Sequence, residues 1–183
     1  MTTPIIDEIF ATFRELGGVH YGEDVTQMAH ILQSAHLARI DRAPIALIGA
    51  SLLHDIGQFL DDAGNAAEQK GIDARHEVTG AAYLAQYFPD EVTEPVRLHV
   101  QAKRYLCAAE PDYLQSLSNA SVLSLELQGG PHSPQEMNDF ISLPQAADAI
   151  RLRRYDDQAK RRDWEVPGLE CYRSLLESLL VRD

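Results

Sequence analysis

The chain has 183 residues, of which 45% are hydrophobic, and its 28 acidic and 16 basic residues give a formal net charge of -12. This length predicts one domain with a core large enough to fold without staples, and the acidic balance argues against nucleic acid, whose phosphates need a basic surface. No apolar run approaches the roughly 18 residues of a membrane-spanning helix, the N-terminus lacks the features of a signal peptide, and two cysteines without a metal motif favour a reduced cytoplasm.

The apolar residues follow a helical period almost throughout the chain, and no alternating strand pattern or repeat is visible. The predicted helices are, in chain order, 4–16, about 24–40, 44–54, 75–88, 90–105, 113–127, a short one opening at 133, 143–157 and 168–181. Gly17 and Gly18 stop the first of these helices. The polar segment 58–74 is predicted to be a long loop with one turn of helix. The predicted fold class is therefore all-α.

Three local signals refine these helices. Asp24 or Thr26 is a suitable N-cap for the second helix. Pro95 lies inside the helical pattern that starts at residue 90, which predicts a late start or a kink. The segment Ser133–Glu136 has the pattern of a capping box, in which the first and last side chains satisfy each other's backbone N–H groups.

His54 and Asp55 stand together at the end of the apolar stretch 45–53, and Gly57 follows at once. Burying a carboxylate without a partner costs on the order of several kcal/mol, and one metal ion can partner both groups. Further candidate ligands lie on other predicted helices: His30, His76, His99 and Asp156. Four imidazoles and two carboxylates exceed the usual needs of one ion, so they predict a dinuclear site between helices. Nitrogen and oxygen ligands suit Fe, Mn, Zn or Mg.

Two of these helices also carry a cation on the face that carries a ligand. Lys103 lies one turn after His99, and Arg153 lies three residues before Asp156. Both cations can therefore reach the same cavity and bind an anionic substrate. A single histidine on an amphipathic helix is more often an ordinary core or surface residue, and His36 is assigned so, as is His132.

The order of the six ligands resembles that of the HD-domain superfamily in its dinuclear form, and longer motifs narrow the resemblance. These motifs are Gly22–His30, Leu53–Gly57, His99–Leu106, Leu127–Pro131 and Leu152–Asp156. They look like those of the small HD-domain mixed-valent diiron oxygenases, which cleave the carbon–phosphorus bond of 1-hydroxyphosphonates. The resemblance implies a single HD domain over 1–183, with the metal-ligand core at about 20–160 and a C-terminal helix at about 168–181.

The resemblance also implies a role for each motif residue. The first iron would be held by His30, His54, Asp55 and Asp156. Asp55 would bridge to the second iron, which His76 and His99 complete, and Asp55 and His99 are the catalytic candidates. The phosphonate would be bound by Lys103, Arg153 and Ser121, and the ammonium group of the substrate by Glu23.

Two positions differ from the family pattern. The family has a tyrosine on the second iron where this chain has His20, and Tyr21 lies one residue later. Either Tyr21 takes that role through a shifted loop, or the role is absent in this chain. The family also has a histidine that helps to hold the phosphonate where this chain has Gln58. An amide still donates a hydrogen bond but brings no charge.

The reaction that the resemblance implies is the oxidative cleavage of a 1-hydroxy-2-(amino or trimethylammonio)ethylphosphonate to glycine or glycine betaine and phosphate. One O2 and a mixed-valent Fe(II)/Fe(III) pair suffice for this four-electron oxidation. The absence of a glycine-rich dinucleotide motif agrees with it. The six ligands by themselves leave a metal-dependent phosphohydrolase or phosphodiesterase open, in which the metals activate water. A regulatory nucleotide-binding module is a third reading, against which the complete ligand set argues. The oligomeric state is left open.

Overall fold

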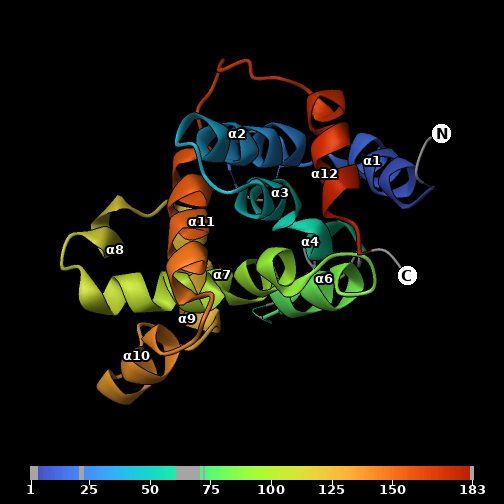
Figure 1. Cartoon of the computed structure of the whole chain (residues 1–183). Coiled ribbons are helices and arrows are strands. Elements are labelled where there is room, and N and C mark those ends of the chain that lie inside the picture. Colours follow the sequence, from blue (N-terminus) through green and yellow to red (C-terminus); the bar gives the residue numbers. More distant parts are fainter. Residues whose placement is uncertain (1–3, 21–22, 61–70, 72, 182–183) are drawn as a thin grey trace.

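A computed structural model describes residues 4–20, 23–60, 71 and 73–181 of the chain. These residues form helices joined by turns and loops (Figure 1), and no strand occurs among them. The all-α prediction is confirmed. Within the described ranges no helix has the length and apolar character needed to cross a membrane. Tyr21 and most of the predicted loop 58–74 lie outside the described residues.

The helices follow the predicted ranges, most of them to within a few residues. They are α1 (Pro4–Leu16), α2 (Gln27–Ile40), α3 (Ile45–Leu53), α4 (Ile56–Leu60), α6 (His76–Leu84), α7 (Asp90–Ala109), α8 (Tyr113–Ser116), α9 (Asn119–Leu127), α10 (Pro134–Ile141), α11 (Ala146–Gln158), the 3-10 helix η1 (Leu169–Tyr172) and α12 (Arg173–Leu179). Thr26 caps α2, because its side chain accepts a hydrogen bond from the N–H of Ala29. The capping box of Ser133 and Glu136 is confirmed at the start of α10.

Three helix predictions need correction. The segment 113–127 is not one helix, because Leu117 and Ser118 have extended backbone angles and the Ser118 side chain caps a new helix, α9. The last segment begins as a 3-10 helix before α12. The helix α7 neither starts late nor ends at residue 105: it includes Pro95 and continues to Ala109. Pro95 has no backbone N–H, so α7 lacks one helical hydrogen bond at that position.

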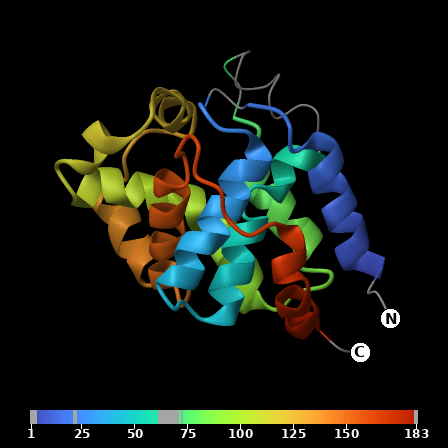
Figure 2. The same cartoon turned by 90° about the horizontal axis from the view of Figure 1, so that it is seen from above.

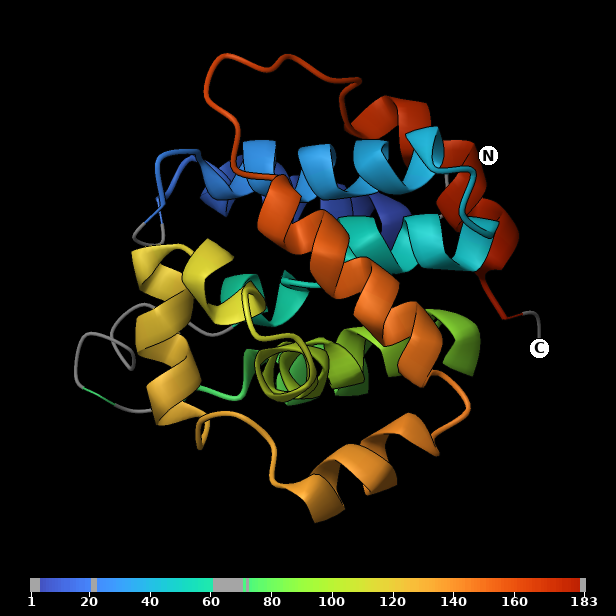
Figure 3. The same ribbon diagram turned by 90° about the vertical axis from the view of Figure 1, so that its left-hand side faces the viewer.

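The helices α2, α3, α7 and α11 form the part of the fold that holds the buried polar groups. The helix α2 packs against α3, and α11 contacts both α2 and α7. Figure 3 shows α11 crossing from α2 to α7. Two views of the molecule, Figures 1 and 2, place α8 and α10 on the side opposite to α1 and α12.

Two apolar clusters support this arrangement. The larger cluster includes Phe13 of α1, Ile31 of α2 and Leu52 of α3, each of which has no exposed surface. The smaller one joins α7, α10 and α11 through Leu98 and Phe140, among others. Burying each large side chain of this kind contributes roughly 1.5–3 kcal/mol relative to exposure. The clusters therefore fix the four helices that carry the polar centre.

Candidate metal centre

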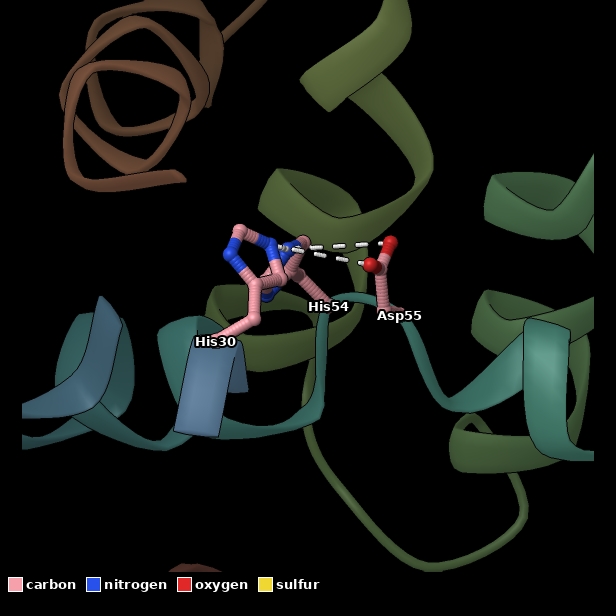
Figure 4. A group of neighbouring side chains, drawn as sticks. All are labelled: His30, His54 and Asp55. Atoms are coloured by element: carbon pink, nitrogen blue, oxygen red, sulfur yellow. Dashed lines mark hydrogen bonds and ion pairs between the residues drawn. The ribbon is translucent and has the colours of Figure 1, made fainter. Parts of the chain in front are cut away.

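The six predicted metal ligands meet in the interior of the fold, although they come from five helices or helix ends. His30 belongs to α2, His76 to α6 and His99 to α7, while Asp156 lies on α11. His54 is the C-cap of α3 and Asp55 follows it. Figure 4 shows His30 of α2 facing His54 and Asp55 at the end of α3. All six are buried except His76, which is partly buried.

The distances between the candidate ligand atoms are short enough for the residues to share metal ions. His30 Nε2 lies 3.2 Å from His54 Nε2 and 3.3 Å from an oxygen of Asp156. In the second half of the site, His76 Nε2 lies 3.2 Å from His99 Nε2 and 3.3 Å from Asp55 Oδ1. Two ligand atoms that bind the same ion, each at about 2.1 Å, lie about 3.0–3.4 Å from one another. Two three-residue groups can hold an ion, and Asp55 belongs to both of them.

Three of the four histidines are oriented by a backbone carbonyl group. Their Nδ1 atoms face Ala159 O (2.9 Å from His30), Ser51 O (2.9 Å from His54) and Val96 O (2.7 Å from His99). A carbonyl oxygen only accepts, so each Nδ1 carries the proton and each Nε2 keeps its lone pair toward the centre. The Nε2 atoms of His30 and His54 then face each other. A metal ion fits this arrangement because it accepts both lone pairs.

The ionisation states also suit metal ligands. Burial lowers the pKa of His99 to about 3 and lowers the pKa of His54, so both imidazoles are neutral at neutral pH. Burial alone would raise the pKa of Asp55, but the neighbouring His54 and His76 hold it well below its usual range. His54 and His99 are therefore present as neutral imidazoles and Asp55 as a carboxylate, the forms that bind a metal ion. Burial opposes the charged form of His30, but the neighbouring Asp156 raises its pKa.

The predicted substrate residues in the described part of the chain line one cavity with the ligands. They are Glu23, Gln58, Lys103, Ser121 and Arg153. Tyr21 is not among the described residues. The side chain of Lys103 is almost completely buried, at 1% exposure, and its Nζ donates to Ser124 Oγ at 2.8 Å.

Arg153 is held between carboxylates and the cavity. Its Nη1 lies 2.8 Å from Asp156 Oδ2, and its guanidinium also binds Asp157. Burial disfavours the charged form of Arg153, but Asp156 and Asp157 hold its pKa well above the usual range. Its Nη2 donates to Ser121 Oγ at 3.4 Å. The predicted phosphonate residues are therefore brought together, although Arg153 also supports a predicted metal ligand.

Three further residues take part in the site without having been assigned a role from the sequence. Gln27 donates through Nε2 to Asp55 Oδ2 at 2.5 Å, and Ser118 donates to Glu23 Oε1 at 2.6 Å. Lys160 forms an ion pair with the same carboxylate oxygen, at 2.8 Å. Spacing offered a signal for one of them, because Gln27 precedes His30 by three residues on the same helix, whereas Lys160 lies beyond the end of α11. Ser118 had no such signal.

The chain is similar over most of its length to two curated dioxygenases. It is 44% identical over 178 residues, 96% of this chain and 88% of the relative, to the hydroxymethylphosphonate dioxygenase of Gimesia maris. It is 42% identical over 177 residues, 96% of this chain and 90% of the relative, to the (1-hydroxy-2-(trimethylamino)ethyl)phosphonate dioxygenase (glycine-betaine-forming) of Leisingera caerulea. An uncharacterized protein of Acanthamoeba polyphaga mimivirus is 32% identical over 174 residues, 93% of this chain and 80% of that protein. No family model matches the chain.

Proposed function

We propose a reaction for this chain from its family: it belongs to the phosphonate dioxygenases, and it uses O2 to cleave the carbon–phosphorus bond of a 1-hydroxyphosphonate. One observation carries this proposal. The two ligand groups that share Asp55 open onto the same cavity as Lys103 and Arg153. A redox-capable metal pair beside two buried cations suits the oxidation of a small anion.

The metal that we assign to both positions is iron, in a mixed-valent pair. His30, His54, Asp55 and Asp156 would hold one ion, and Asp55, His76 and His99 the other. The nitrogen and oxygen donors suit iron, and oxidation by O2 favours it over Zn or Mg, which do not change oxidation state. When bound, the iron pair would supply the site for O2 and the electron transfer.

The residues of the chain would bind and orient the substrate. Lys103 and Arg153 would pair with the phosphonate oxygens, and Ser121 Oγ would donate a third hydrogen bond. Such charge-assisted bonds are stronger at a buried site than in water. Gln58 lines the same cavity and would contribute an amide N–H.

The reaction balances with one O2 and no further reductant. The 1-hydroxyphosphonate loses its C–P bond and its C1–H bond, C1 becomes a carboxylate and phosphorus leaves as phosphate. The two atoms of O2 complete the carboxylate and the phosphate. Three substrates are candidates. Two carry a cationic group at C2, amino or trimethylammonio, as predicted from the sequence. The third is hydroxymethylphosphonate, which has no cationic group and for which the Gimesia maris relative is named.

The test is to measure metal content, O2 uptake and phosphate release on the iron-loaded protein with each candidate phosphonate. We expect two irons per chain, equal amounts of O2 consumed and phosphate released, and an EPR signal of a coupled Fe(II)/Fe(III) pair after half-oxidation. Release of phosphate from a phosphate ester without O2 uptake, combined with no turnover of any phosphonate, would instead establish the hydrolase.

A further inference from the structure

The carboxylate of Glu23 already has a cationic partner within the chain. Lys160 Nζ lies 2.8 Å from Glu23 Oε1, 3.0 Å from Ser121 Oγ and 3.3 Å from Ser118 Oγ. An ammonium group has three N–H donors, and these three acceptors match them. The two side chains of the ion pair are only 15% and 20% exposed, so water screens the pair weakly.

The position of Lys160 is tied to the metal centre. The residue before it, Ala159, is completely buried and ends α11 as its C-cap. The carbonyl oxygen of Ala159 accepts the hydrogen bond from His30 Nδ1 at 2.9 Å. The backbone next to Lys160 is therefore fixed by a predicted metal ligand, and Lys160 directs its ammonium group to the wall of the cavity.

We infer that Lys160 determines substrate specificity by occupying the cation position beside Glu23, so that the enzyme prefers a 1-hydroxyphosphonate without a cation at C2. This inference rests on the proposed function and names the substrate class for the same site. The preferred substrate is small and carries no cationic group, as in hydroxymethylphosphonate. The two dioxygenase relatives are almost equally similar to this chain, so the percentage identity does not distinguish between their substrates. The ion pair of Lys160 and Glu23 does.

A cationic substrate meets two obstacles at this position. A substrate ammonium that takes the place of Lys160 at Glu23 Oε1 displaces Lys160 from its three acceptors, which leaves the Lys160 charge partly buried and without its partner. A trimethylammonium group has no N–H and cannot replace those hydrogen bonds. The phosphonate is not excluded, because Ser121 Oγ lies within reach of both Lys160 and Arg153 Nη2. An added positive charge beside the phosphonate subsite favours the anionic end of the substrate.

The experiment compares hydroxymethylphosphonate with its 2-amino-1-hydroxyethyl and trimethylammonio counterparts. Anaerobic titration calorimetry gives the affinity of the iron-loaded protein for each compound, and O2 uptake gives kcat/KM. The variants are Lys160→Met and, as the matched control, Arg162→Met, which removes the same charge two residues away. Arg162 pairs with Asp24, the neighbour of Glu23, at an exposed position outside the cavity.

We expect the wild type to prefer the hydroxymethyl compound. Lys160→Met should change the ratio of affinities by roughly tenfold or more in favour of the amino compound, because Glu23 becomes available for a charge-assisted bond. Adding Glu23→Gln to Lys160→Met should abolish that gain. Arg162→Met should alter the ratio by no more than about fivefold, as for an exposed pair.

Other outcomes overturn the inference and are separable from failure of the function. A wild type that consumes O2 but prefers a cationic substrate contradicts it, even if Lys160→Met does not fold. An equal loss of affinity for all three compounds in Lys160→Met makes Lys160 a phosphonate ligand instead. If the wild type consumes no O2 with any of the three compounds, the proposed function fails first.

Discussion

Replacing Asp55 with alanine tests the shared carboxylate directly. Four histidine Nε2 atoms lie 3.3–3.9 Å from its two oxygens, and Asp55 belongs to both ligand groups. Its loss should therefore remove both ions rather than one. Each ion at a free concentration of about 100 times its Kd stabilises the folded state by about 2.7 kcal/mol, so two ions contribute roughly 5 kcal/mol. For a domain of this size that corresponds to an increase in Tm of about 10–20 °C.

The assay measures iron per chain by elemental analysis and Tm with and without a chelator. The chelator should remove the full metal-dependent increase in Tm from the wild type. The Tm of Asp55→Ala should be almost the same with and without the chelator. Asp41→Ala is the control, because Asp41 forms an exposed ion pair with Arg151 away from the site. If Asp55→Ala keeps one ion, the carboxylate serves a single metal, and if it keeps two, the residue is no ligand.

Three more substitutions test the substrate cavity, the support of Asp55 and the apolar core. Lys103→Ala should leave the iron content unchanged but weaken phosphonate binding by about one to two orders of magnitude, measured by anaerobic calorimetry; unchanged affinity would place Lys103 outside the subsite. Gln27→Ala should lower metal affinity by roughly 10- to 100-fold, because Gln27 orients Asp55, and a chelator competition series would show it. Leu52→Ala, at a site with no exposed surface, should cost about 2–5 kcal/mol of unfolding free energy in urea. A loss below about 1 kcal/mol would mean that the core relaxes around the cavity.

The gathering of the six candidate ligands in the interior was predictable from the sequence, because a buried ionisable group is costly and therefore conspicuous. His54 and Asp55 interrupt an apolar run, and no stable core tolerates such a pair without a partner. The helices were predictable for a similar reason, since their ends carry residues with a local mechanism, such as Thr26 or the Ser133 capping box. Each signal of either kind is contained in a few consecutive residues of the chain.

The break at Ser118 and the role of Lys160 were not predictable in this way. Apolar periodicity continues across residues 113–127, but the helix is interrupted at Ser118, whose hydroxyl caps α9 and also donates to Glu23. The contact between Lys160 and Glu23 joins positions 137 residues apart. Helical periodicity does not predict where the Lys160 side chain lies, because this residue follows the end of α11. Long-range pairs of this kind depend on the packing of α2, α9 and α11.

The balance of charge around the cavity explains why this pairing matters for the substrate. Its lining carboxylates are Glu23, Asp55 and Asp156, and its lining cations are Lys103, Arg153 and Lys160, so the protein charges cancel when the histidines are neutral. Two bound iron ions would then leave the site strongly positive, and a phosphonate would neutralise part of that charge. A cationic group on the substrate would oppose this neutralisation unless a carboxylate were available for it. Glu23 is engaged by Lys160, so the same charge balance that attracts the phosphonate disfavours a cationic group at C2.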